Sequence, residues 1–212
     1  MDTTRLTLLR ELTTQAVATA RTSELGEKRE SDVSQGVSCW SKSVIDSSLR
    51  SFTAQGEIKA PMAVIAPLLW DGAKRLEWDI SYDSVTVIES STPSESESAK
   101  LVRLVIKPVL VVSSRDFCML QLRTDGNGFI GAVAFSVDDP RVPISNDCVR
   151  GDVLSGSSWV LTPTSDGKSS ILTYTILTNI SGWVPSLIIN NAVGSTLAKY
   201  FIALSAKVTG IP

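Results

Sequence analysis

A long apolar segment near the C-terminus constrains the fold more than any other feature of this sequence. Pro185 stands where a first helical residue is expected, and the segment from there to Lys207 carries charges only at Lys199 and Lys207. At ~1.5 Å per residue this helix would be roughly 34 Å long. Apolar side chains lie nearly all round it, so most of its surface should be buried. Because a lysine at the centre of a membrane-spanning helix costs roughly 2.5–3.5 kcal/mol, we expect a helix of a soluble protein. Its pattern fits either a plain core helix or the wall of a cavity.

The rest of the chain is mostly strand, broken by short helical pieces. Helices are predicted at 4–22, 62–69 and 72–76, and strands at 36–44, 50–59, 80–89, 100–106, 113–123, 129–137, 148–154, 158–163 and 170–178. The polar runs 90–98 and 138–147 are interpreted as loops, and 45–49 as a hairpin-like link. This order indicates an α+β fold around an antiparallel sheet. No repeat or composition shift divides it, so one domain over 1–212 is expected, with a helix and connector in 1–30.

Several predicted strands are apolar on both faces. In 113–123, Phe117 and Met119 lie on one face, while Cys118, Leu120 and Leu122 lie on the other. A sheet with one wet face would alternate more cleanly. We therefore expect a sheet that is covered on both sides or that curls around something apolar.

Composition excludes several functions. The net charge of −2 argues against a broad phosphate-binding surface, so no nucleic-acid partner is expected. The chain has no histidine, which excludes a Ser-His or Cys-His nucleophile pair and an imidazole-dependent zinc site, and no cofactor or metal is predicted. Three cysteines without a CxxC spacing favour buried reduced thiols and a cytoplasmic location. The N-terminus has no secretory h-region, and Asp2 is not the glycine that myristoylation requires.

Six short motifs in order resemble the START domain, the lipid-transfer domain of the steroidogenic acute regulatory protein and its relatives. They are Trp40; 52–58 followed by Pro61; 76–79; 113–117; 149–151 before Trp159; and 182–185 leading into 188–190. The resemblance covers about residues 37–206 and implies a helix-grip fold. In that fold a curved antiparallel sheet wraps around a long C-terminal helix, and an internal cavity between them holds one lipid.

The resemblance also implies function and site residues. The chain is expected to bind a sterol or a phospholipid in a hydrophobic tunnel and to carry it between membranes, as a monomer in transient contact with the membrane. The residues that sterol carriers use as a cavity acid and base line up with Ser84 and Gln121, and Asp83 or Arg123 lie within a residue or two. Arg115, with Asp116, is either architectural or a headgroup contact. The ligand-binding candidates are Ser84, Arg115, Phe117, Met119, Gln121, Ile189, Val193, Leu197, Tyr200 and Leu204. The predicted gate is the loop 107–112, with Pro108, Val109 and Leu110 at its core, unless that stretch simply continues a strand.

Two other functions stay open from the sequence. A lipid-sensing or protein-interaction module that transfers nothing would carry the same motifs. An enzyme on the same scaffold would need carboxyl or phenol groups for acid-base work; the candidates are Asp79, Asp83, Glu89, Asp116, Tyr174 and Tyr200. The lipid class, whether sterol, phosphatidylcholine, ceramide or fatty acid, is not fixed by the sequence.

Overall fold

The computed structural model describes residues 1–22, 25–28, 36–44, 47, 49–108, 112–181 and 186–210, and within the last segment it describes side chains at 193 and from 196 onward. The helices are α1 (Thr3–Arg21), α2 (Met62–Trp70), α3 (Gly72–Leu76) and α4 (Ser186–Thr209). The strands are β1 (Glu27–Lys28), β2 (Ser38–Ser43), β3 (Arg50–Ile58), β4 (Tyr82–Ser94), β5 (Glu97–Ile106), β6 (Arg115–Gly126), β7 (Phe129–Ser136), β8 (Val149–Arg150), β9 (Asp152–Val153), β10 (Ser157–Pro163), β11 (Ser170–Ile176) and β12 (Thr178–Asn179).

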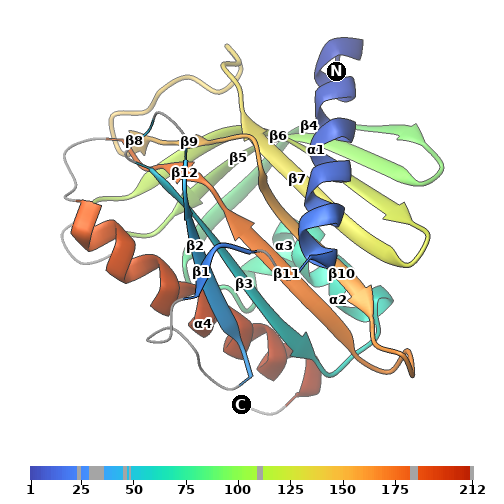
Figure 1. The fold of residues 1–212 in the computed structure, drawn as a ribbon. Coiled ribbons are helices and arrows are strands. Elements are labelled where there is room, and N and C mark those ends of the chain that lie inside the picture. The colour runs from blue at the N-terminus through green and yellow to red at the C-terminus, as the bar shows by residue number, and fades with distance from the viewer. Residues whose placement is uncertain are drawn as a thin grey trace.

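In the described part of the chain, ten strands form one curved sheet. Its order is β1-β2-β3-β11-β10-β7-β6-β5-β4, every neighbouring pair is antiparallel, and β8 adds to β6 in parallel. Figure 1 shows α4 running along β2 and β3, with α1 on the opposite side of the sheet. The predicted fold, a curved antiparallel sheet around a long C-terminal helix, is confirmed.

The sheet has a separate hydrophobic core on each face. On the inner face, Leu197, Phe201 and Leu204 of α4 pack with α2 and with β2, β3, β10 and β11. On the outer face, Leu9 and Leu12 of α1 pack over β5, β6, β7 and β10. Two cores explain why the sequence shows strands that are apolar on both faces, because the β6 side chains from Arg115 to Leu120 are buried whichever way they point.

The hairpin of β4 and β5 differs from the sequence prediction. Residues 90–98, predicted as a solvated loop, are mostly paired strand, with Ser91 opposite Ala99 and Ser94 opposite Glu97. β4 is an edge strand with a register shift between Ser91 and Ser94, so Pro93 can stand there without depriving a neighbour of a hydrogen bond. Glu97 is buried beside α1, where Arg10 Nη2 lies 2.7 Å from its Oε2.

Two other predicted strands are interrupted. The segment 148–154 divides at Gly151 into β8 and β9, and the segment 170–178 divides at Leu177 into β11 and β12. A Cβ at Gly151 would lie 2.5 Å from the ring of Phe117, so the chain passes this point close to the inner face. β9 and β12 then pair with each other in a second, two-stranded sheet. The predicted irregular stretch 138–147 contains neither helix nor strand.

The two short helices set up the site. Pro61, immediately before the predicted helix 62–69, is the N-cap of α2. Asp71, immediately before the predicted helix 72–76, caps α3, with its Oδ1 accepting from the backbone N–H of Ala73 and Lys74. The predicted connector and the link 45–49 lie partly outside the described residues. Among the helices that the structure describes, none has the length and apolar character needed to cross a bilayer.

Candidate functional site

A cavity of about 540 Å³ lies between the concave face of the sheet and α2, α3 and α4. Strands β5, β6, β7, β10 and β11 supply most of its wall. Its apolar lining includes Val102, Leu104, Ile106, Phe117, Met119, Ala132, Ala134, Trp159, Ile176, Val193 and Leu197. The volume falls inside the range of about 300–1,000 Å³ typical of ligand sites.

Six of the candidate residues line this cavity. Phe117, Met119 and Gln121 alternate along β6 and face inward, and α4 contributes Val193, Leu197 and Tyr200. The i, i+4 and i+3 spacing of the three α4 residues places them on one face of the helix.

Two candidates, Ser84 and Leu204, lie away from the wall. Ser84 of β4 stands opposite Val105 of β5, and this pair faces away from the cavity. A register shift between Tyr82 and Ser84 produces this pairing. Leu204 is fully buried in the inner core, beyond the cavity wall. The Ile189 side chain, together with gate residues Val109 and Leu110, lies outside what the structure describes. Pro108 is exposed and follows the end of β5 at Ile106.

Arg115 is also absent from the wall and ties loops together. Its Nε donates to the carbonyl of Ile180, its Nη2 to that of Ser181, and its Nη1 to the carbonyl and hydroxyl of Ser113. The neighbouring Asp116 is fully buried and accepts hydrogen bonds from Arg103 and Arg150. Burial raises the pKa of Asp116, but the hydrogen bonds of Arg150 and Arg103 outweigh it and lower the pKa overall. The geometry is that of an architectural pair.

The most strongly charged part of the wall is the ion pair of Arg75 and Asp79, one helical turn apart at the end of α3. Arg75 Nε lies 2.9 Å from Asp79 Oδ2, and the residues are 5% and 6% exposed. Asp79 also accepts from the backbone N–H of Ser81 at 3.2 Å and from its hydroxyl. Both members face the cavity, so its wall contains a buried charge pair.

Aromatic rings surround the Arg75 guanidinium. Its Cζ lies 4.6 Å from the ring centroid of Tyr82, 4.8 Å from that of Tyr200, 5.3 Å from that of Trp78 and 5.9 Å from that of Tyr174. The Tyr174 and Tyr200 rings are stacked at 4.7 Å. These contacts stabilise the cation by the ring quadrupoles and hold its direction.

The Tyr200 hydroxyl is the one buried side-chain polar atom in the described residues that has no hydrogen-bond partner. Burial raises the pKa of Tyr200 well above its usual range, against the opposing influence of the Arg75 charge, so the hydroxyl stays protonated. A buried polar group left unpaired costs roughly 1–3 kcal/mol. Because Tyr200 lines the cavity, a ligand atom there can supply the missing partner.

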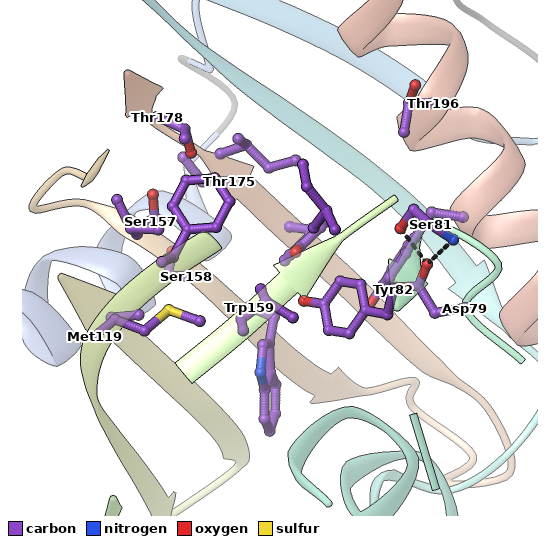
Figure 2. A pocket seen from close by; sticks show the side chains of 18 of the residues that line it. Asp79, Ser81, Tyr82, Met119, Ser157, Ser158, Trp159, Thr175, Thr178 and Thr196 are labelled. Carbon is purple, nitrogen blue, oxygen red and sulfur yellow. Dashed lines mark hydrogen bonds between the residues drawn. The ribbon is translucent and has the colours of Figure 1, made fainter. Parts of the chain in front are cut away.

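The opposite side of the cavity is lined with hydroxyl groups. Figure 2 shows Ser157, Ser158, Thr175 and Thr178 facing Asp79, Ser81 and Tyr82 across the space. Thr175 is hydrogen-bonded to Thr53 at 3.0 Å. The Ser157 hydroxyl bonds the backbone of Leu177 in both directions. The hydroxyls of Thr175 and Ser157 are therefore already partnered, in contrast to that of Tyr200.

The sequence reasoning missed Arg75 and Lys100 as cavity residues. It weighed Asp79, Tyr174 and Tyr200 only as acid-base candidates. The i, i+4 spacing of Arg75 and Asp79 was a usable signal, since such pairs meet on a helix. The tyrosines that complete the cluster come from distant elements, and only the folded sheet brings them together.

A curved sheet closed by a C-terminal helix over an apolar cavity with a polar end defines a helix-grip protein with an internal ligand site. The profile of the START domain matches residues 10–208 of the sequence. The chain therefore belongs to the START domain family.

Solved structures of other proteins share the fold. Human StAR-related lipid transfer protein 5 superposes with a TM-score of 0.85 at 17% identity, covering 95% of this chain and 94% of that one. Human STARD10 gives 0.79 at 18% identity, with 93% and 79% covered. A STAR-related lipid transfer protein fragment from Xanthomonas axonopodis gives 0.67 at 20% identity, with 86% and 98% covered. No curated protein sequence matches the chain significantly.

Proposed function

We propose that this protein binds one lipid in the internal cavity and carries it between membranes. The observation that supports this most directly is the combination of a large apolar wall with a few polar groups, of which the Tyr200 hydroxyl lacks a partner. A lipid has the matching form, an apolar body with one polar group. Its polar group would face the charged and hydroxyl-bearing side chains of the wall, and its body would lie along β5, β6 and α4.

The cavity volume limits the size of the lipid. A water-sized group needs about 15–30 Å³, so this cavity holds on the order of 18–36 non-hydrogen atoms. A sterol or a single-chain lipid has that size. A diacyl phospholipid is larger and would need the cavity to expand.

The need for a carrier follows from the hydrophobic effect. Each methylene in water costs about 0.8 kcal/mol relative to an apolar site, so a chain of about sixteen methylenes costs on the order of 13 kcal/mol. Free diffusion of such a lipid is negligible. The proposed route into the cavity is the loop 107–112, where Lys107 and Val112 line the cavity and Pro108 is exposed.

We propose a carrier rather than an enzyme. Asp79 and Asp116, the buried carboxylates among the acid-base candidates, are both engaged by arginines. Contact with a membrane is proposed to be transient, by a monomer in the cytoplasm.

The test is transfer of a fluorescent sterol and a fluorescent single-chain lipid between donor and acceptor vesicles. Catalytic amounts of the protein should speed exchange of one of them well above the spontaneous rate. Binding without faster exchange would indicate a lipid sensor instead. The absence of binding to either lipid would refute the proposal.

A further inference from the structure

Lys100 is a second buried cation in the cavity wall, carried by β5, whereas Arg75 belongs to α3. It belongs to the inward-facing register of β5, with Val102, Leu104 and Ile106, and is 9% exposed. Gln121 lies directly opposite it on β6 and also faces the cavity. Lysine is almost never buried to this extent unless it has a partner of opposite charge.

No carboxylate among the described residues forms an ion pair with Lys100. Its Nζ donates to the backbone carbonyl of Trp70 at the end of α2 and lies 3.9 Å from the centroid of the Trp70 indole. An ammonium has three N–H donors, so the carbonyl leaves two for other partners. The Asp71 carboxylate, the nearby negative charge, is used to cap α3.

Most of the charged side chains in the cavity wall are positive. Among the described residues its charged side chains are Arg50, Arg75, Lys100 and Lys107 against Asp79, although the chain has a net charge of −2. Arg50 is paired with Glu27, and Arg75 with Asp79. Lys100 is thus the deeply buried cation of this wall that lacks a counter-ion.

We infer that Lys100 binds the anionic head of the lipid, a carboxylate or a phosphate, inside the cavity. This rests on the proposed function and names its ligand class. The head would accept hydrogen bonds from the two open Nζ donors, with the Gln121 amide beside it. From Lys100 to Ile106, β5 extends about 20 Å at ~3.3 Å per residue, which gives a single apolar chain a wall to follow toward Pro108.

A merely structural lysine would hold the end of α2 through Trp70 and would be indifferent to the ligand head. An anion-binding lysine makes affinity depend on head charge.

Burial lowers the pKa of Lys100 to about 8, with Asp71 opposing and Arg75 reinforcing the shift. Of the groups that face it, Trp70 and Gln121 do not titrate, Asp71 is the nearby carboxylate, and the pKa of Arg75 is raised well above its ordinary value, so its charge stays constant. Affinity for an anionic head should therefore be high at pH 7 and fall above about pH 8.

The experiment measures equilibrium binding of three probes with the same chain: palmitate, hexadecyl phosphate and hexadecanol. Lys100→Met keeps the apolar length of the side chain and removes the charge. At pH 7 it should weaken palmitate and hexadecyl phosphate by about ten- to hundredfold and leave hexadecanol within about twofold. Lys100→Arg should retain anion binding and lose the fall above pH 8. Lys168→Met, in the exposed turn between β10 and β11, is the matched control.

Whichever anionic probe binds more tightly to the wild type identifies a carboxylate or a phosphate as the head. If Lys100→Met binds the anionic probes as tightly as the wild type, or weakens all three probes equally, the inference is overturned. If Lys100→Met does not fold, loss of the pH dependence in Lys100→Arg carries the test. Binding of hexadecanol or a sterol without any preference for anions would refute the inference alone, whereas failure of every lipid to bind would refute the proposed function.

Discussion

Separating Arg75 from Asp79 should destabilise the protein much more than removing both charges. Each side chain is almost fully buried, and Nε and Oδ2 lie 2.9 Å apart. Asp79→Ala leaves the Arg75 guanidinium among aromatic rings without its carboxylate. Breaking a buried pair in this way costs about 3–5 kcal/mol. For a chain of this size, that is a fall in Tm of about 6–20 °C.

Replacing both residues by apolar ones of similar size removes the uncompensated charge. Arg75→Met with Asp79→Leu should therefore be close to neutral, or stabilise by about 1–4 kcal/mol. Such a result would indicate that the ion pair serves ligand binding and does not stabilise the fold. The double variant should therefore fold but bind a lipid with a polar head more weakly than the wild type.

Urea denaturation followed by tryptophan fluorescence measures the change in the free energy of unfolding for Asp79→Ala and for the double variant, since the chain has five tryptophans. Midpoints at equal m-values are compared for the wild type, Arg75→Met, Asp79→Leu and the double variant that combines them, and Asp79→Ala is compared with the wild type. A cost below about 1 kcal/mol for Asp79→Ala would contradict the structural argument. So would a double variant that is as unstable as the sum of the two single variants.

Three further predictions follow from other groups. Tyr200→Phe should stabilise the lipid-free protein by about 1–2 kcal/mol, because it removes an unpaired buried hydroxyl. The same variant should bind lipid more weakly. A loss of stability would contradict the unpaired state of this hydroxyl. Val193→Trp should block lipid uptake while the far-ultraviolet circular dichroism stays unchanged, and uptake by that folded variant would show that the cavity is misassigned. The free energy of unfolding of the wild type, measured relative to that of Lys100→Met, should rise by about 3 kcal/mol from pH 8 to pH 10.5. The reason is that in this range the unfolded chain keeps a proton on Lys100 that the folded chain has lost. Parallel pH curves for the two proteins would contradict the burial of that charge.

Much of the fold could be predicted because its signals are local. The apolar run of α4, the Asp71 cap of α3 and the doubly apolar β6 are visible in the sequence and correspond to what the structure contains. The hairpin at 90–98 was missed because Ser, Pro and Glu are typical of loops. Its pairing depends on an edge position and on the contact between Glu97 and Arg10 of α1.

The site was less predictable than the fold. Alternation along β6 and the stripe on α4 identified apolar wall residues such as Met119 and Val193. The polar contacts depend on tertiary placement: Arg75 meets Tyr82, Tyr174 and Tyr200 only after the sheet curves. Ser84 was predicted in the site from its alignment with a cavity residue of the family's sterol carriers. The register shift after Tyr82 instead places it opposite Val105, away from the cavity wall.

The most direct test of lipid binding is native mass spectrometry of the purified protein, followed by extraction and identification of any bound lipid. The account predicts a single lipid at one-to-one stoichiometry, with one polar head and a size that fits about 540 Å³. Protein that is empty as purified, and stays empty after incubation with vesicles that contain sterols, fatty acids and phospholipids, would contradict it.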